Sequence, residues 1–212
     1  TARPLDQPPL ILIPGAFGSS LRDRRSGREL WPASDSRLLL GNYRERELPI
    51  DPLTLQPDPG SAEAVAVFRK GLGRDFYGHL LETLQGVGYR RCRPGQPPAG
   101  NAACSLYTYL YDFRLDKVRA AAGLGMLIEQ VRADFGDPRL AVDVVAHSNG
   151  GLLARYFIRH GALAGKPGSP DEAARAIRRL VLVGTPNMGT LQVVLSLLRG
   201  EEIGLRRIPP EV

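Results

Sequence analysis

The sequence predicts an α/β fold, with helices on both faces of a mostly parallel sheet. Three short, continuously apolar segments, at 10–13, 141–145 and 180–183, have the length and composition of strands that are buried on both faces. Two longer segments, at 118–135 and 152–160, carry apolar residues at helical spacing. Because strands and helices alternate along the chain, we expect parallel strands joined by helical crossovers.

The other segments complete one continuous domain over residues 1–212. Apolar residues at helical spacing predict a helix at 76–84, and a Tyr-rich run predicts a strand at 106–113. A last helix is expected near 190–198. Between 32 and 75 prolines interrupt every periodicity, and we interpret this range as an irregular, cap-like insertion.

Composition narrows the class of protein. The chain carries 28 Lys and Arg against 22 Asp and Glu, but the arginines are scattered over turn-rich stretches. A nucleic-acid partner is therefore not expected, and the basic surface is either simply solvated or weakly attracted to anionic membrane or substrate surfaces. No apolar run approaches the length of a membrane-spanning helix. Cys92 and Cys104 flank a Pro/Gly-rich stretch, where a disulfide and two unpaired thiols both remain open.

A nucleophile elbow is predicted directly after strand 141–145. The turn is Ala146-His147-Ser148-Asn149-Gly150, and a helix follows it. The residues two before and two after the serine must be small, and no other serine of the chain meets this condition. A chance match is the alternative, but the strand–turn–helix context favours Ser148 as a nucleophile above the N–H groups of a helix N-terminus.

A second oxyanion donor is expected in the turn after the first strand, at 14–18. Gly15 and Gly18 let this backbone approach a substrate, so the amide of Ala16 or Phe17 can face a carbonyl oxygen. An ordinary glycine-rich turn is the alternative. The spacing matches neither phosphate-binding fingerprint, and the motifs imply no metal and no organic cofactor.

Three stretches together resemble the lecithin:cholesterol acyltransferase family. They are 9–21 with Trp31 soon after, Tyr-Asp-Phe-Arg-Leu at 111–115, and the elbow followed by Gly-Thr-Pro-Asn-Met-Gly-Thr at 184–190. Their order and spacing agree with that family over residues 9–198. The second stretch has Phe113 where the family has Trp, and the lid region is short, which leaves the size and headgroup of the substrate open.

This resemblance implies an α/β-hydrolase fold and a Ser-Asp-His triad that acts on glycerolipid or sterol esters, as a phospholipase or an O-acyltransferase. It places the oxyanion donors on the backbone amides of Ala16 and Asn149, and makes Phe17 a wall of the acyl pocket. Asp112 and Arg114 are expected to form an ion pair that supports the end of a strand.

The acid and base of such a triad should follow the serine in the chain. His160 is expected at the far end of the helix that leaves the elbow, roughly 18 Å from Ser148, which is too far for a hydrogen bond. His147 should point to another side of the turn, and His79 lies on an earlier helix. None of the later carboxylates follows a recognisable strand; they are Asp171, Glu172, Glu201, Glu202 and Glu211. We therefore expect a chain truncated before the last strands, with both groups outside these 212 residues.

The sequence thus predicts a serine esterase, lipase or O-acyltransferase that forms an acyl-enzyme on Ser148. Two alternatives remain: a lipid-binding pseudoenzyme without a base, and a generic carboxylesterase for small esters. The expected partners are a lipid or ester substrate and, peripherally, a lipid surface. The family resemblance and the cysteine pair favour an extracytoplasmic location. The particular lipid, the balance of hydrolysis and transfer, and the oligomeric state are left open.

Overall fold

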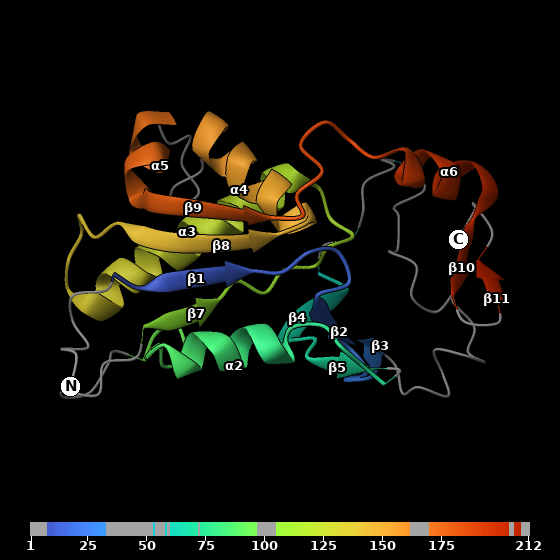
Figure 1. Ribbon diagram of the computed structural model, residues 1–212, viewed down its shortest axis with the longest axis horizontal. Helices are drawn as coiled ribbons and strands as arrows, with labels where there is room; N and C mark the ends of the chain where they lie inside the picture. Colours follow the sequence, from blue (N-terminus) through green and yellow to red (C-terminus); the bar gives the residue numbers. More distant parts are fainter. Residues whose placement is uncertain are drawn as a thin grey trace.

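The central sheet consists of four parallel strands in the order β7-β1-β8-β9 (Figure 1). The computed structural model describes residues 8–32, 53, 58, 60–71, 73–96, 105–161, 170–203 and 206–208. The strands of the sheet are β1 (Leu10–Ile13), β7 (Leu106–Thr108), β8 (Val142–His147) and β9 (Ile177–Val183). The predicted α/β character and mostly parallel sheet are confirmed.

Helices cover both faces of this sheet. The helices are α2 (Gly78–Gly86), α3 (Lys117–Phe135), α4 (Asn149–His160), α5 (Pro170–Ala176) and α6 (Leu191–Arg199). Residues of α3, α4 and α5 share one buried apolar cluster with the sheet, and residues of α2 share a second cluster on the opposite face. In Figure 1, α6 lies beyond the carboxyl ends of the strands.

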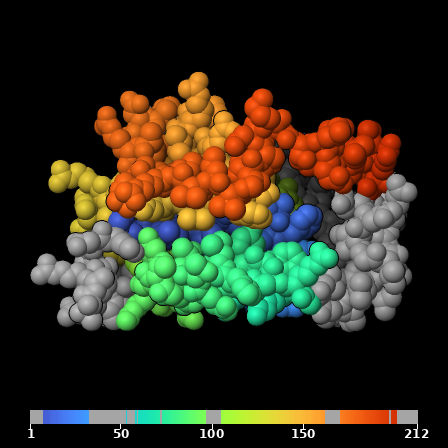
Figure 2. All heavy atoms as spheres, viewed as in Figure 1, coloured from blue at the N-terminus to red at the C-terminus, as the bar shows by residue number. Residues whose placement is uncertain are grey.

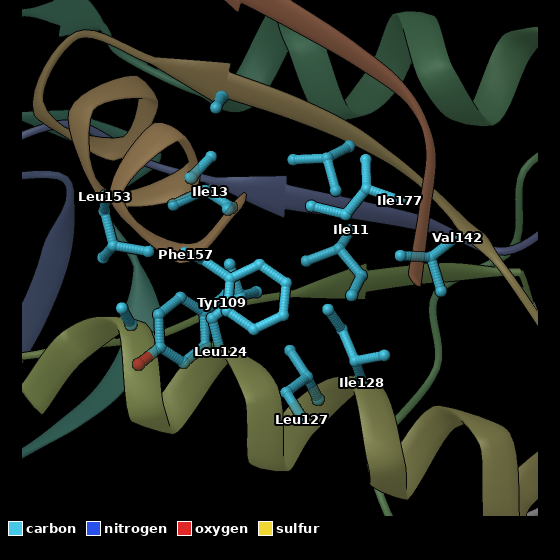
Figure 3. Close-up of a cluster of buried hydrophobic side chains, with 14 of the residues drawn as sticks. Ile11, Ile13, Tyr109, Leu124, Leu127, Ile128, Val142, Leu153, Phe157 and Ile177 are labelled. Atoms are coloured by element: carbon cyan, nitrogen blue, oxygen red, sulfur yellow. The ribbon is translucent and has the colours of Figure 1, made fainter. Parts of the chain in front are cut away.

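The burial of β1 explains its continuous apolar sequence. Side chains alternate between the faces of a strand, so Ile11 and Ile13 belong to the cluster under α3 and α4, while Leu10 and Leu12 face α2. Figure 3 shows Ile11 and Ile13 directed toward the helices, with Phe157 of α4 among them. Because both faces of β1 are buried, none of its four positions tolerates a polar side chain without loss of stability.

The edge strand β9 departs from the prediction of a strand buried on both faces. Val181, Leu182 and Val183 are exposed, and the orange atoms of this region reach the surface in Figure 2. Within the described residues, β9 pairs only with β8, and the helices that contact it are α4 and α5. Apolar composition alone therefore did not distinguish a central strand from an edge strand.

Part of the range predicted to be irregular is regular strand. Residues 62–67 form β4 (Ala62–Val67), which pairs with an antiparallel neighbour, and its two end residues Ala62 and Val67 are buried in different apolar clusters. The prediction of irregular structure is wrong there, while residues 33–52 lie outside the described part. The additional strands are β2 (Ser19–Asp23), β3 (Glu29–Trp31), β5 (Lys70–Gly71), β6 (Arg74–Asp75), β10 (Glu201–Ile203) and β11 (Arg206–Ile208).

Two further element boundaries were misplaced. The strand expected at 106–113 ends at Thr108, because the chain then turns and the amide of Tyr111 donates to the Ser19 hydroxyl. On the helix expected at 76–84, Phe76 is half exposed, and the buried aromatic residue is its neighbour Tyr77. The apolar stripe therefore begins one residue later than its spacing indicated.

Cys92 is disulfide-bonded, which decides between the two alternatives for the cysteines. The other cysteine of the sequence, Cys104, lies outside the described residues. Among the helices that the structure describes, none has both the length and the apolar character needed to cross a membrane.

Candidate active site

Ser148 occupies a strained turn between β8 and α4. Its φ of 49° and ψ of −121° lie outside the regions that non-glycine residues commonly adopt. The backbone amide of Ser148 donates to the carbonyl of Val183 on β9 at 2.8 Å, and α4 begins at the next residue. The Ser148 side chain does not cap this helix. A conformation that costs about 1–3 kcal/mol persists only where the surrounding fold enforces it, as these neighbours do.

The small residues around Ser148 are required by the close approach of β1. A Cβ atom on Gly150 would lie 2.5 Å from the carbonyl oxygen of Pro14 and 2.7 Å from that of Ile13. Ala146 is fully buried, paired with Ile13 on one side and Leu182 on the other. The small residues at 146 and 150 are therefore explained by the close packing of the backbone at the end of β1 against the elbow.

The turn at 14–18 lies directly against the elbow. The register pairs Ile13 with Ala146, so the residues that follow both strands meet at the carboxyl edge of the sheet. A Cβ atom on Gly15 would lie only 2.9 Å from the Cβ of Ser148. Ala16 is exposed beside this contact. The structure thus places Gly15 against Ser148, with Ala16 and Asn149 as the next residues of the two segments, and the oxyanion role of the two amides stays a prediction.

Tyr77 links the turn to the elbow. Its hydroxyl accepts a hydrogen bond from the backbone N–H of Gly15 at 2.7 Å and lies 2.7 Å from Nδ1 of His147. The roles in this second hydrogen bond follow from the tautomer of His147: Tyr77 donates when Nδ1 is unprotonated, and His147 donates when Nδ1 carries the proton.

Tyr111 makes the equivalent link on the other side of Ser148. Its hydroxyl donates to the carbonyl oxygen of Pro14 at 2.9 Å and accepts from Nδ2 of Asn149 at 3.1 Å. Burial raises the pKa of both Tyr77 and Tyr111, so that each hydroxyl keeps its proton at neutral pH. Sequence reasoning missed both hydroxyls, because nothing local distinguishes them from other buried tyrosines.

The protonation state of His147 gives a testable pH dependence. Burial lowers the pKa of His147 below its ordinary value of 6.5, because the charged form loses hydration. The unfolded chain therefore binds this proton more readily than the folded one, and stability is full above pH 6.5 and declines as the pH falls toward the lowered pKa. Replacing His147 with Asn keeps a polar side chain that can donate to or accept from Tyr77, and it removes the titration. We expect the melting temperature of the wild type to fall more between pH 7 and pH 5 than that of His147→Asn.

Aromatic side chains surround the outer part of the turn. Phe17 is about half exposed and has a φ of 62°. Its ring lies 5.1 Å from that of Trp31 and 4.9 Å from that of Phe113, and Nε1 of Trp31 donates to the Phe17 carbonyl at 2.7 Å. These contacts hold an apolar surface next to Gly15, and the role of Phe17 as a wall of an acyl pocket stays a prediction.

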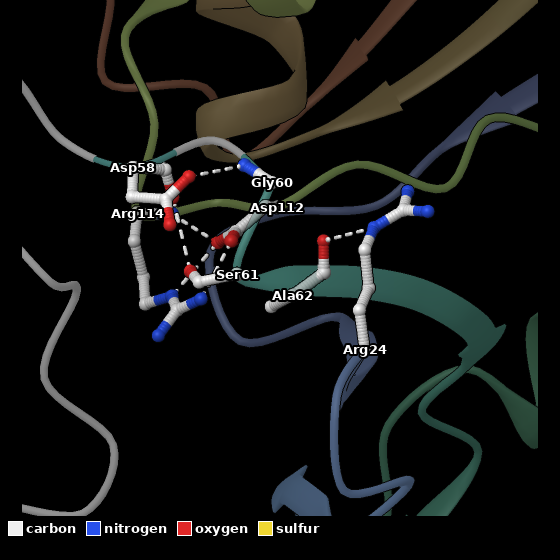
Figure 4. Close-up of polar contacts among 7 residues, drawn as sticks. All are labelled: Arg24, Asp58, Gly60, Ser61, Ala62, Asp112 and Arg114. Atoms are coloured by element: carbon white, nitrogen blue, oxygen red, sulfur yellow. Dashed lines mark hydrogen bonds and ion pairs between the residues drawn. The ribbon is translucent and has the colours of Figure 1, made fainter.

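The predicted ion pair between Asp112 and Arg114 forms. The guanidinium donates through Nε and Nη2 to the two carboxylate oxygens, at 2.9 and 2.7 Å, and both side chains are largely buried. Figure 4 shows the pair beside the 58–61 turn, where Asp58 accepts from the amide of Gly60. The pair follows the Tyr111 segment and supports its path toward the site.

Neither of the other two histidines is placed to serve as the general base. His160 ends α4, and its ring contacts Tyr156 at 4.4 Å; His79 is exposed near Asp75. Since the helix rises about 1.5 Å per residue, His160 is about 18 Å from Ser148. In the part of the chain that the structure describes, His, Cys, Asp and Glu form no group of three that can hold a metal ion.

The fold and this site define an α/β protein with a serine on a strained strand–helix turn. A family model described as "Domain of unknown function (DUF7379)" matches residues 118–193, which is less than half of the chain. The crystal structure of the Tle4–Tli4 complex contains a chain with a similar fold, with a TM-score of 0.55 and 19% identity. The match covers 95% of this chain and 50% of that one, so this chain spans half its length. No curated protein matches the chain.

Proposed function

We propose that the protein is an α/β-hydrolase-type serine acyl hydrolase or O-acyltransferase with Ser148 as its nucleophile. The observation that carries the proposal is the positive φ of Ser148 at the end of β8, with Gly15 packed against its Cβ. A strained serine above a helix N-terminus is the arrangement that nucleophile elbows use to expose the hydroxyl. A merely structural serine needs neither the strain nor the glycine contact.

In this mechanism the Ser148 hydroxyl attacks an ester carbonyl, and the backbone N–H groups of Ala16 and Asn149 stabilise the oxyanion. A general base accepts the serine proton, and the alcohol leaves to give an acyl-enzyme. Water or an acceptor alcohol then releases the acyl group. We do not assign the base and its acid partner to residues of this chain. The three histidines have other contacts: His79 lies near Asp75, His147 is hydrogen-bonded to Tyr77, and the His160 ring contacts Tyr156.

Lipid esters are the proposed substrates. The resemblance to the lecithin:cholesterol acyltransferase family supports this class, and so does the apolar surface formed by Phe17, Trp31 and Phe113 beside Gly15. Such aromatic rings favour contact with an aliphatic acyl chain over contact with a small polar ester. Phospholipase and O-acyltransferase activities are the finer alternatives within this proposal.

The test is covalent labelling of the full-length protein with a fluorophosphonate probe, followed by identification of the modified peptide. We expect the label on Ser148, and we expect it to be lost in Ser148→Ala. A matched control is Ser26→Ala, in the exposed turn between β2 and β3, which should label like the wild type. Label elsewhere, or undiminished label in Ser148→Ala, would contradict the nucleophile assignment.

The same preparation distinguishes the alternatives. Faster turnover of p-nitrophenyl palmitate than of p-nitrophenyl butyrate supports a lipid esterase, and the reverse order indicates a generic carboxylesterase. Absence of both label and turnover, together with binding to phospholipid vesicles, would indicate the pseudoenzyme.

A further inference from the structure

One peptide group, between Pro14 and Gly15, is held at both of its polar atoms by buried tyrosine hydroxyls. Tyr77 accepts from its N–H, and Tyr111 donates to its carbonyl oxygen. Each tyrosine also contacts one neighbour of Ser148: Tyr77 contacts His147, and Tyr111 contacts Asn149. The two hydroxyls therefore connect the 14–18 turn to the residues on both sides of Ser148.

We propose that Tyr77 and Tyr111 are positioning residues that fix the Ala16 amide relative to Ser148 for catalysis. This inference rests on the proposed function. We call these two residues and the peptide group between them the tyrosine brace. Neither tyrosine is assigned a contact with substrate, and both act through the backbone of the turn.

The geometry explains why such a brace is needed. Gly15 has no side chain to restrict its backbone, and the exposed Ala16 follows directly, so rotation of the Pro14–Gly15 peptide would redirect the Ala16 N–H. Misplacement by about 1 Å can cost a factor of about 100 in rate. Hydrogen bonds at both ends of the peptide oppose this rotation.

The brace is anchored in the rigid part of the fold. Tyr77 directly precedes α2 and is packed with Leu12 and Leu81 in the cluster on that face of the sheet. Tyr111 follows β7 and belongs to the cluster on the opposite face of the sheet, where its ring stacks on that of Tyr109 with centroids 5.6 Å apart. Both tyrosines are at most 6% exposed. Because two separate elements supply the hydroxyls, the position of the turn is tied to the whole sheet.

The brace also assigns a role to the imidazole next to the nucleophile. The hydrogen bond with Nδ1 of His147 gives the Tyr77 hydroxyl a second fixed partner besides the Gly15 amide. The T-shaped contact of the two rings, with centroids 5.6 Å apart, is consistent with this fixed arrangement.

The experiment compares Tyr77→Phe and Tyr111→Phe with the wild type in the full-length protein, using p-nitrophenyl butyrate and p-nitrophenyl palmitate. Each substitution removes only the hydroxyl. We expect kcat to fall at least about ten-fold while KM changes less than about two-fold, since negative charge on the carbonyl oxygen develops in the transition state and the tetrahedral intermediate but not in the bound ester. Since both residues act on one peptide group, the double variant should lose less than the product of the single effects.

The matched control is Tyr107→Phe. Tyr107 is also a buried tyrosine, but its hydroxyl donates to Asp134 at 3.1 Å, in the core under α3. It should keep the kcat of the wild type even where it lowers stability. An equal loss of kcat in Tyr107→Phe, or an unchanged kcat in Tyr77→Phe and Tyr111→Phe, would overturn the inference.

A second measurement does not depend on turnover. Hydrogen exchange of the Gly15 amide should be at least about ten-fold faster in Tyr77→Phe, because the amide loses its acceptor, and unchanged in Tyr107→Phe. An unchanged rate in Tyr77→Phe would show that there is no brace. A wild type without any ester turnover would instead count against the proposed function, so the two failures are distinguishable.

Discussion

Ser148→Ala is expected to lower ester turnover by a factor of about 10⁴ or more in the full-length protein, because the proposed acyl-enzyme forms on the Ser148 hydroxyl. The substitution removes one oxygen atom that does not cap α4, so the fold should be retained. Turnover of p-nitrophenyl esters, with circular dichroism and melting temperature as controls for folding, measures both expectations.

Two outcomes would separate catalysis from structure. Residual activity within about ten-fold of the wild type would show that another residue is the nucleophile. Loss of activity together with a large fall in melting temperature would attribute the effect to folding. Ser26→Ala serves again as the control, since its hydroxyl contacts Asp23 in an exposed turn.

Gly150→Ala is expected to destabilise the protein by about 3 kcal/mol, at the upper end of overpacking costs. Its new Cβ would meet the carbonyl oxygens of Pro14 and Ile13 at 2.5 and 2.7 Å, and backbone atoms at the end of a buried strand cannot move aside as a flexible side chain can. The melting temperature should fall by about 6–12 °C for a domain of this size. Displacement of the 14–18 turn should also lower kcat.

Gly86→Ala is the matched control for this substitution. Gly86 ends α2 without a positive φ, and a Cβ atom there meets nothing within 4 Å. Since Ala is the better helix former by up to about 1 kcal/mol, Gly86→Ala should be neutral or slightly stabilising. Equal melting temperatures for Gly150→Ala and the wild type would show that β1 and α4 are not packed as closely as described.

Local sequence patterns predicted the helices and strands in which the burial of side chains follows a regular pattern along the chain. The continuous apolar run at 10–13 indicated a strand buried on both faces, and β1 is such a strand. The helix expected at 118–135 begins one residue earlier, where the Asp116 side chain caps it, and ends before Gly136 in the left-handed conformation. The small residues at 146 and 150 predicted a tight turn at Ser148, because the close backbone packing of such a turn leaves no space for larger side chains two positions away.

Patterns of the same kind failed where burial depends on a distant neighbour. Val181 and Val183 have the composition of a core strand, yet they are exposed because β9 lies at the edge of the described sheet. Residues 62–67 follow a proline-rich stretch and were expected to be irregular, and pairing with β2, about forty residues earlier in the chain, makes them a strand. The exposure of β9 and the strand conformation of 62–67 thus depend on which strand lies next to each of them in the fold.

The sequence by itself determined the parallel α/β framework and the position of the serine, since periodicity and the demand for small residues are local properties of the chain. Only the tertiary structure decided how the turn after β1 is held against that serine. Gly15 and Tyr77 are separated by 62 positions, and Pro14 and Tyr111 by 97. Tyr111 reaches the turn because the parallel strands β7 and β1 end at the same edge of the sheet, and Tyr77 reaches it because the start of α2 packs on the sheet beside Leu12. Both juxtapositions are properties of the folded chain.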